Sequence, residues 1–238
     1  SNRYCIEDFF GNAMDIGLRG LASRKVSQGR YQRKAYATTL TLNRQRADYS
    51  AQAKVATDGG NYVGEWVTKW GRHGRGEFTK PKLGTYKGCW LFDKQHGWGL
   101  LTYKVDRYEG FWVNGVKHGR GKELDREGRE YEGYFVNNLK CGRGILRYPD
   151  GSVYDGDWVD GLKTGHGIQK YEDGAEYDGD WANGKKHGKG VFVYASGSKY
   201  EGGWVDGHEE GWGILTRTNG ERYEGGNLTP PFSPKSFP

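Results

Sequence analysis

Four histidines that each stand directly before the first glycine of a Gly-x-Gly motif are the residues in this chain best suited to metal chemistry. They are His73, His96, His118 and His187. Imidazole nitrogen binds zinc at about 2 Å, but residues that recur once per two-stranded repeat lie roughly 9–10 Å apart in a sheet. Two such rings cannot share one ion. We therefore predict no metal site and expect the histidines to stack or form hydrogen bonds beside turns.

A Gly-x-Gly motif recurs seven times and is similar to part of a phosphate-binding loop. The pairs are Gly74/Gly76, Gly97/Gly99, Gly119/Gly121, Gly142/Gly144, Gly165/Gly167, Gly188/Gly190 and Gly211/Gly213. Phosphate-binding loops open a helix, whereas these glycines lie inside strand-like segments. No nucleophile, base and orienting acid recur together either. The sequence therefore predicts no cofactor, no catalytic residue, no small-molecule substrate and no enzyme activity.

The residues between the paired glycines form a mostly basic column, which is the candidate partner-binding surface. They are Arg75, Trp98, Arg120, Arg143, Lys189 and Trp212, with His166 in the fifth pair. One interpretation is cross-strand pairing with acids such as Asp155 and Asp178, worth about 0.2–1 kcal/mol per pair. The other is a groove that binds charged partners. Trp98 and Trp212 interrupt the basic residues, so we expect them to be the most exposed tryptophans.

An internal repeat positions these residues and is the strongest pattern in the sequence. Each unit opens with a tyrosine: Tyr62, Tyr86, Tyr108, Tyr131, Tyr154, Tyr177, Tyr200 and Tyr223. Successive tyrosines are 24, 22, 23, 23, 23, 23 and 23 residues apart. Seven full units and an eighth opening strand therefore follow one another without a linker.

Each unit contains two strand-like halves joined by turns. The first half has the form Tyr-acid-Gly-x-Trp, as at residues 154–158, and period-two alternation places its Tyr, Gly and Trp on one face. Dipeptides such as Asn114-Gly115 and Asp160-Gly161 favour tight hairpin turns. We expect a ring of an adjacent strand to lie over each bare glycine, with both glycines of the Gly-x-Gly pair on that face. The predicted structural aromatic rows comprise Tyr62, Trp66, Tyr86, Trp90, Tyr108, Trp112, Tyr131, Tyr154, Trp158, Tyr177, Trp181, Tyr200, Trp204 and Tyr223.

The composition favours a thin β-structure over a domain with one thick aliphatic core. Only 34% of the residues are hydrophobic, while 15% are aromatic and 41 are glycine. We predict an all-β fold: an elongated, twisted antiparallel meander of tandem 23-residue β-hairpin repeats with an irregular N-terminal arm. Residues 58–226 hold the repeats, residues 1–57 the basic arm, and residues 227–238 a Pro-rich tail.

The phrase Tyr-Glu-Gly-x-Trp…Asn-Gly…His-Gly-x-Gly resembles the MORN (membrane occupation and recognition nexus) repeat over residues 62–226. The resemblance implies the hairpin fold. It is closest to ciliary and axonemal MORN scaffolds such as radial-spoke-head components, although similar repeats also occur in junctional membrane proteins, phosphoinositide kinases and lysine methyltransferases. Some units depart from the pattern: Phe135 replaces a tryptophan, and Cys141 replaces a histidine. We expect individual units to face different neighbours.

The N-terminal arm holds the whole charge excess. Residues 1–57 contain ten Lys or Arg and four acids, whereas residues 58–238 contain 26 of each. The arm residues predicted to bind partners are Arg24, Lys25, Arg30, Arg33, Lys34, Arg44 and Arg46. Such an arm attracts acidic protein tails, including those of tubulin, or anionic lipid, and we do not expect nucleic acid as a partner. The alternative is an extended segment packed on a neighbour. A short docking helix is predicted from the apolar residues Ile6, Phe9, Phe10, Met14, Leu18 and Leu21.

The spacing of the cysteines and the lack of a long apolar run in the sequence predict an intracellular protein. Cys5, Cys89 and Cys141 have no paired spacing, so we expect free thiols in a reducing compartment. No apolar run approaches the roughly 20 residues that span a bilayer. Glu7 and Asp8 interrupt the first apolar residues, so no signal peptide is predicted, although the chain begins without Met.

Three functions are compatible with these patterns. We favour a non-enzymatic structural scaffold in a large cytoskeletal assembly of the cilium or axoneme, with the arm and the repeat faces binding protein subunits. The second is peripheral attachment to anionic phospholipid. Two observations argue against it: the repeat array has no net charge, and we expect no apolar face to remain for insertion. The third is a non-catalytic targeting module of a larger enzyme.

Overall fold

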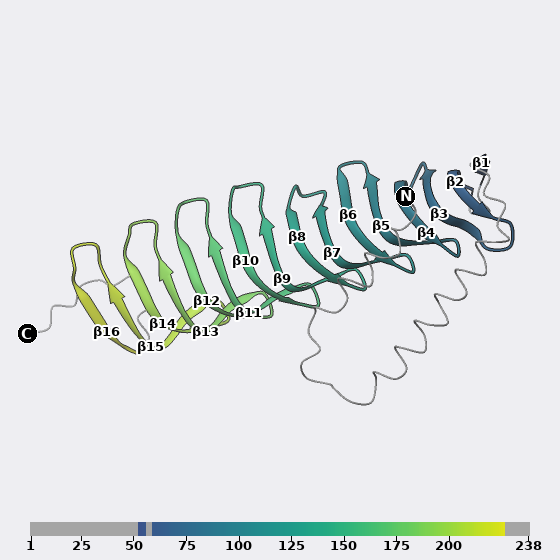
Figure 1. The fold of residues 1–238 in the computed structure, drawn as a ribbon. Helices are drawn as coiled ribbons and strands as arrows, with labels where there is room; N and C mark the ends of the chain where they lie inside the picture. The colour runs from purple at the N-terminus through teal and green to yellow at the C-terminus, as the bar shows by residue number, and fades with distance from the viewer. Residues whose placement is uncertain (1–51, 56–58, 227–238) are drawn as a thin grey trace, which may run out of the picture. The chain divides into compact units, whose positions relative to one another are not determined.

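The computed structural model describes the backbone of residues 52–55 and the whole of residues 59–226 (Figure 1). The chain divides into two units, residues 1–119 and 120–238. The described residues form strands and turns without any helix, which confirms the predicted all-β hairpin fold. Among them, accordingly, no helix has the length and apolar character needed to cross a membrane.

The strands follow one another along the sheet in chain order, each antiparallel to its neighbour within a unit. The first unit contains β1 (Gln52–Val55), β2 (Asn61–Val67), β3 (Gly71–Lys80), β4 (Gly84–Leu91), β5 (Lys94–Tyr103) and β6 (Asp106–Val113). β7 (Val116–Leu124) contains the boundary between the units. The second unit contains β8 (Glu130–Val136), β9 (Leu139–Arg147), β10 (Val153–Val159), β11 (Leu162–Lys170), β12 (Glu176–Ala182), β13 (Lys185–Val193), β14 (Lys199–Val205), β15 (His208–Thr216) and β16 (Arg222–Gly226).

The sheet begins inside the segment predicted as the arm. β1 pairs with β2 from Gln52, opposite Gly64, to Val55, opposite Asn61. The end of the arm therefore lies beside the first repeat strand. The seven basic arm residues, the predicted docking helix and the tail at 227–238 lie outside the described residues.

The first turns that carry Asn-Gly or Asp-Gly have the geometry that the dipeptide predicts. Asn114 and Gly115 have φ values of 52° and 87°, and Asp160 and Gly161 have values of 50° and 83°. Two consecutive positive φ values define the type I′ turn, which Asn-Gly and Asp-Gly adopt at low cost because their twist matches that of the strands. The hairpin turns are therefore confirmed.

Tyrosine rings cover cross-strand pairs of glycines in the core. Gly156 of β10 is paired with Gly167 of β11, and the nearest side chain to both is the ring of Tyr154. Tyr154 belongs to the same strand as Gly156. The prediction that the covering ring comes from an adjacent strand is thus wrong for the first glycine and right for the second. A tyrosine two residues before a glycine on an extended strand shares its face and can fold back over it.

The buried rings form a continuous series of edge-to-face contacts. Tyr154 lies 5.3 Å from Trp158 and 5.1 Å from Trp181, with interplanar angles of 90° and 80°. Trp181 also donates its indole N–H to the carbonyl oxygen of Gly167 at 3.0 Å. Such aromatic pairs contribute about 0.5–1.5 kcal/mol each beyond their buried area.

The predicted aromatic rows are buried except near the ends of the sheet. Trp66 is only half-buried, and Tyr223 is 38% exposed. The prediction of Tyr223 as a core residue is wrong: it stands on β16, the last strand of the described residues. Phe135, which replaces a tryptophan, is 1% exposed and fills the same place.

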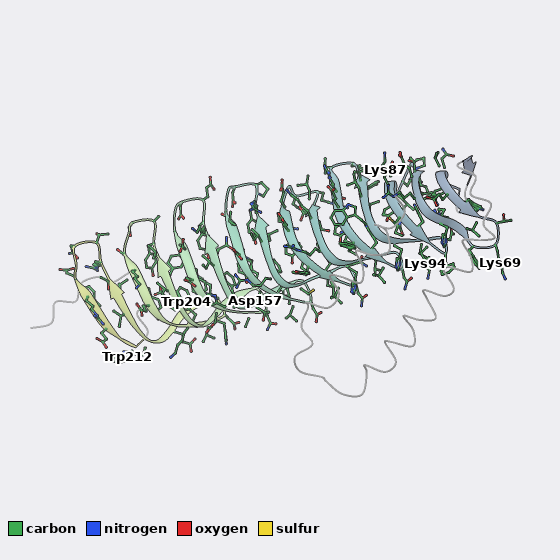
Figure 2. The ribbon with its side chains drawn as sticks, in the orientation of Figure 1. Lys69, Lys87, Lys94, Asp157, Trp204 and Trp212 are labelled. Carbon is green, nitrogen blue, oxygen red and sulfur yellow. The ribbon has the colours of Figure 1, made fainter. Side chains whose placement is uncertain are left out.

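The Gly-x-Gly motif contains a β-bulge. The register passes from Gly156 opposite Gly167 to Asp157 opposite Thr164, so Gly165 and His166 are extra residues. Gly165 has a φ of 58°, and only the second glycine of the pair lies under a tyrosine ring. The predicted continuous bare strip is therefore wrong. Asp157 accepts a hydrogen bond from the bulged His166 N–H at 3.4 Å (Figure 2), so the acid of the first half stabilises the bulge.

Candidate functional site

The face opposite the tyrosine rings, called the charged face here, carries the predicted basic column. Its six predicted members, Arg75, Trp98, Arg120, Arg143, Lys189 and Trp212, are all exposed. Trp98 is 46% and Trp212 67% exposed, and the other described tryptophans are buried or half-buried (Figure 2). The prediction that these two are the most exposed tryptophans is confirmed for the described residues.

Most residues of the basic column form ion pairs or ring contacts with neighbouring side chains. Arg143 lies 3.3 Å from the Asp155 carboxylate, and His166 lies 3.0 Å from Asp178. Trp98 packs edge-on against Phe111 at 5.2 Å. The predicted cross-strand pairing is thus confirmed at two positions, and such exposed pairs stabilise little. The column is therefore a series of separate local contacts.

The face with the tyrosine rings, called the aromatic face here, carries a second row of cations that the sequence reasoning missed. The lysine row consists of Lys140, Lys163 and Lys186 in the second unit, and Lys117 holds the same position in the first. Each lysine stands two residues before a Gly-x-Gly pair, so its 23-residue recurrence was a usable signal. Each ammonium lies over a core tyrosine, at 4.9 Å from Tyr108 for Lys117 and 5.0 Å from Tyr131 for Lys140. These are cation–π distances.

Lys163 occupies the most enclosed position of the lysine row. Its Nζ lies 4.5 Å from the ring centre of Tyr154, 4.7 Å from Trp181 and 5.3 Å from Tyr148. It donates a hydrogen bond to the side-chain oxygen of Gln169 at 2.6 Å. Among the described residues, the Lys163 ammonium group is thus surrounded by rings and one neutral amide and has no carboxylate within ion-pair distance.

Lys186 has a similar aromatic environment in the next repeat. Its Nζ lies 4.1 Å from the ring centre of Trp204 and 4.3 Å from Phe192. Burial lowers the pKa of both Lys163 and Lys186 to about 8. Desolvation disfavours the charged amine, so both lysines titrate close to physiological pH.

Lys163 should make the protein more stable as the pH rises from about 8 to 10.5, its ordinary pKa. Between these values the unfolded chain holds a proton that the folded chain has released, so the free energy of unfolding increases with pH. Urea unfolding of the wild type and of Lys163→Met at several pH values measures this. Between about pH 8 and 10.5, the free energy of unfolding of the wild type should increase relative to that of Lys163→Met. The same pH dependence in both proteins would contradict the prediction.

The aromatic face of the second unit also holds an open pocket of about 390 Å³. Lys163, Lys186, Gln169 and Trp181 line it, and Tyr148 and Tyr171 stand beside them. Tyr148 is held by a turn in which its N–H donates to Ser152 O at 2.9 Å.

The histidines that precede the Gly-x-Gly pairs and the cysteines can now be placed in the structure. The His73 ring lies 5.6 Å from Phe92, in agreement with a histidine stacked beside a turn, and burial lowers its pKa. Within residues 59–226 no group of three or more metal-binding side chains occurs. Cys141 has a free thiol, as predicted. The free-thiol prediction is wrong for Cys89, which is disulfide-bonded.

An exposed apolar patch lies beside two successive hairpin turns of the second unit. It consists of Val136, Leu139, Val159 and Leu162, which are 44%, 47%, 57% and 49% exposed. The pairs Val136–Leu139 and Val159–Leu162 each close a hairpin. These four residues are exposed because they stand next to the turns, beyond the reach of the core rings.

These features define a class of protein: a repeat scaffold, built from successive antiparallel hairpins that pair in chain order. The sequence matches the MORN repeat family at residues 62–85, 86–104, 108–128, 131–153, 154–176, 177–199 and 200–222. The chain belongs to the MORN-repeat family, whose repeats form a non-catalytic scaffold or interaction module.

The chain is 34% identical over 74 residues to MORN repeat-containing protein 3 of Xenopus laevis, which covers 28% of this chain. The matched segment covers 31% of that protein, so the chain spans less than a third of its relative's length. Among solved structures, the TCP10 domain of Danio rerio CPAP with a STIL peptide is 16% identical, with a TM-score of 0.28 over 74% of this chain and 83% of that one. A virginiamycin B lyase from Staphylococcus aureus is 11% identical, with a TM-score of 0.17 over 75% and 70%. Such low TM-scores carry no implication for function.

Proposed function

We propose that this chain is a non-enzymatic scaffold within a large cytoskeletal assembly, and that its repeat faces and basic arm bind protein partners with acidic segments. The observation that carries the proposal is the exposure of Trp98 and Trp212 on a sheet whose other described tryptophans are buried or half-buried. Tryptophan and arginine dominate the binding energy at protein interfaces, and both stand on the charged face.

Charge complementarity supports an acidic partner. The Lys189 ammonium forms no ion pair with the described residues, although Arg143 in the same column is paired with Asp155. The seven basic arm residues add positive charge from outside the repeats. The cytoskeletal setting rests on the resemblance to ciliary and axonemal MORN scaffolds, and acidic tubulin tails are partners of the required charge.

Co-sedimentation with assembled microtubules tests the proposal. The full chain should pellet, and deletion of residues 1–51, which keeps β1 intact, should lower the apparent affinity by about ten-fold because it removes most of the arm's charge. Lys189→Glu should weaken pelleting by about two- to three-fold. Lys170→Gln is the matched control, since its ammonium is already paired with Glu176 at 3.4 Å.

Two outcomes would count against the proposal. Failure of the full chain to pellet with microtubules would reject the cytoskeletal partner. Equal pelleting of the full chain and of the chain without residues 1–51 would remove the arm from the mechanism and leave the repeat faces as the contact surface.

A further inference from the structure

The pocket on the aromatic face of the second unit combines apolar walls with three lysines, of which Lys185 is paired with Asp206. Its volume of about 390 Å³ lies within the range of roughly 300–1,000 Å³ that is common for ligand pockets. Tyr148 and Tyr171 stand beside it, and Trp181 contributes a ring to its wall. Lys163 and Lys186 line the same space.

The lysine row shows that Lys163 lacks the ion pair that Lys140, its counterpart one repeat earlier, makes. Lys140 is paired with the Glu123 carboxylate at 3.7 Å. Lys163 instead donates a hydrogen bond at 2.6 Å to the neutral Gln169, which stands six residues later in the same strand. Neither Lys163 nor Lys186 has a carboxylate within ion-pair distance among the described residues. The acid beside Lys186 is Glu209, which accepts a hydrogen bond from the Tyr194 hydroxyl.

A partly desolvated ammonium without a counter-charge attracts an anion that can replace its lost water. Here the rings of Tyr154 and Trp181 hold the Lys163 ammonium at 4.5 and 4.7 Å. Aromatic walls suit an anion with an apolar stem, such as the methylene groups of a glutamate side chain. Phosphate groups favour bidentate arginine, whereas the described residues that line this pocket include lysines and no arginine.

We propose that this pocket binds a glutamate side chain of an acidic protein partner, with Lys163 and Lys186 receiving the carboxylate and Tyr148 and Tyr171 enclosing the stem. The inference rests on the proposed function, since it names a contact that such a partner makes. It assigns that contact to the aromatic face, separately from the arm and the charged face.

The binding should weaken as the pH rises through about 8, where Lys163 and Lys186 lose their protons. The other charged groups that line the pocket are Lys185, paired with Asp206 at 3.7 Å, and Asp150, which accepts the Ser152 N–H at 2.8 Å. Burial raises the pKa of Tyr148 and Tyr171 above the ordinary value of 10.0, and nearby Glu209 stays hydrogen-bonded to Tyr194. The lysines are therefore the groups that titrate in this window, and a glutamate ligand remains ionised.

Fluorescence anisotropy with a labelled peptide of alternating glutamate and alanine tests the inference on the full chain. Lys163→Met should weaken binding by about ten-fold or more, because one charge of a desolvated pair is lost. Gln169→Glu should weaken it similarly while keeping both lysines, since it places a carboxylate beside Lys163 as Glu123 stands beside Lys140. Lys170→Gln, on the charged face, should bind as the wild type does.

Three results would overturn the inference: unchanged affinity in Lys163→Met, equal binding of a peptide with glutamine in place of glutamate, or affinity that is constant from about pH 7 to 9.5 at fixed ionic strength. Vesicles of phosphatidylserine that bind through Lys163 when the peptide does not would assign the site to a lipid headgroup instead. Microtubule pelleting that depends on residues 1–51 alone would leave the scaffold role intact. Peptide binding without pelleting would reject the cytoskeletal partner and keep the pocket.

Discussion

Replacement of Tyr154 by alanine is expected to lower the free energy of unfolding by about 3–5 kcal/mol, because it removes a large ring from a filled core. The side chain is 0% exposed. Its ring contacts Trp158 and Trp181 edge-on, and its hydroxyl donates to the Asp157 carbonyl oxygen at 3.1 Å. Urea unfolding followed by tryptophan fluorescence measures the loss.

Tyr223 provides the matched control for this substitution. It opens the eighth unit at the same motif position, yet it is 38% exposed, so Tyr223→Ala should cost about 1 kcal/mol or less. Tyr154→Phe keeps the ring and loses one hydrogen bond, which should also cost about 1 kcal/mol. Equal losses for Tyr154→Ala and Tyr223→Ala would show that burial of these rings does not determine the stability of the array.

The substitution Gly156→Ala is expected to destabilise the protein by about 2–3 kcal/mol, although it adds only one methyl group. The backbone of Gly156 is not left-handed, so alanine would ordinarily stabilise it by about 0.4–1 kcal/mol through the unfolded chain. A Cβ there would lie 2.6 Å from the Gly167 Cα and closer still to the Tyr154 hydroxyl. Because the facing atom is backbone, no side-chain rotation relieves the overlap. Thermal unfolding measures the change.

Two further variants test why position 156 requires glycine. Gly174→Asn lies in a turn with a φ of 87° and no atom within 4 Å of an added Cβ; asparagine tolerates this conformation, so the change should be small. In a Tyr154→Ala background, Gly156→Ala should cost clearly less, because the two residues share one space and their effects are coupled. Additive losses in the double variant would mean that the ring does not create the requirement for glycine.

The repeat and its hairpins follow from the sequence because their determinants are local. Asn114-Gly115 and Asp160-Gly161 specify a turn within two residues, and alternation places Tyr154 and Trp158 on one face whatever lies beyond. The exposure of Trp98 and Trp212 was predictable for the same reason, since each stands between paired glycines on the opposite face from the rings.

Other features depend on which residues meet across strands, and only the tertiary structure decided them. The bulge at Gly165 changes the pairing register, so strict alternation could not show that Asp157 caps it. Lys163 recurs visibly in the sequence, but its neutral partner Gln169 and the ring of Tyr148 come from positions that differ between repeats. Tyr223 has the core motif yet is exposed on β16, the last described strand, so its burial was decided by its neighbours and not by its residue type. Contacts between strands depend on the register and on the identity of the next repeat, which no single repeat encodes.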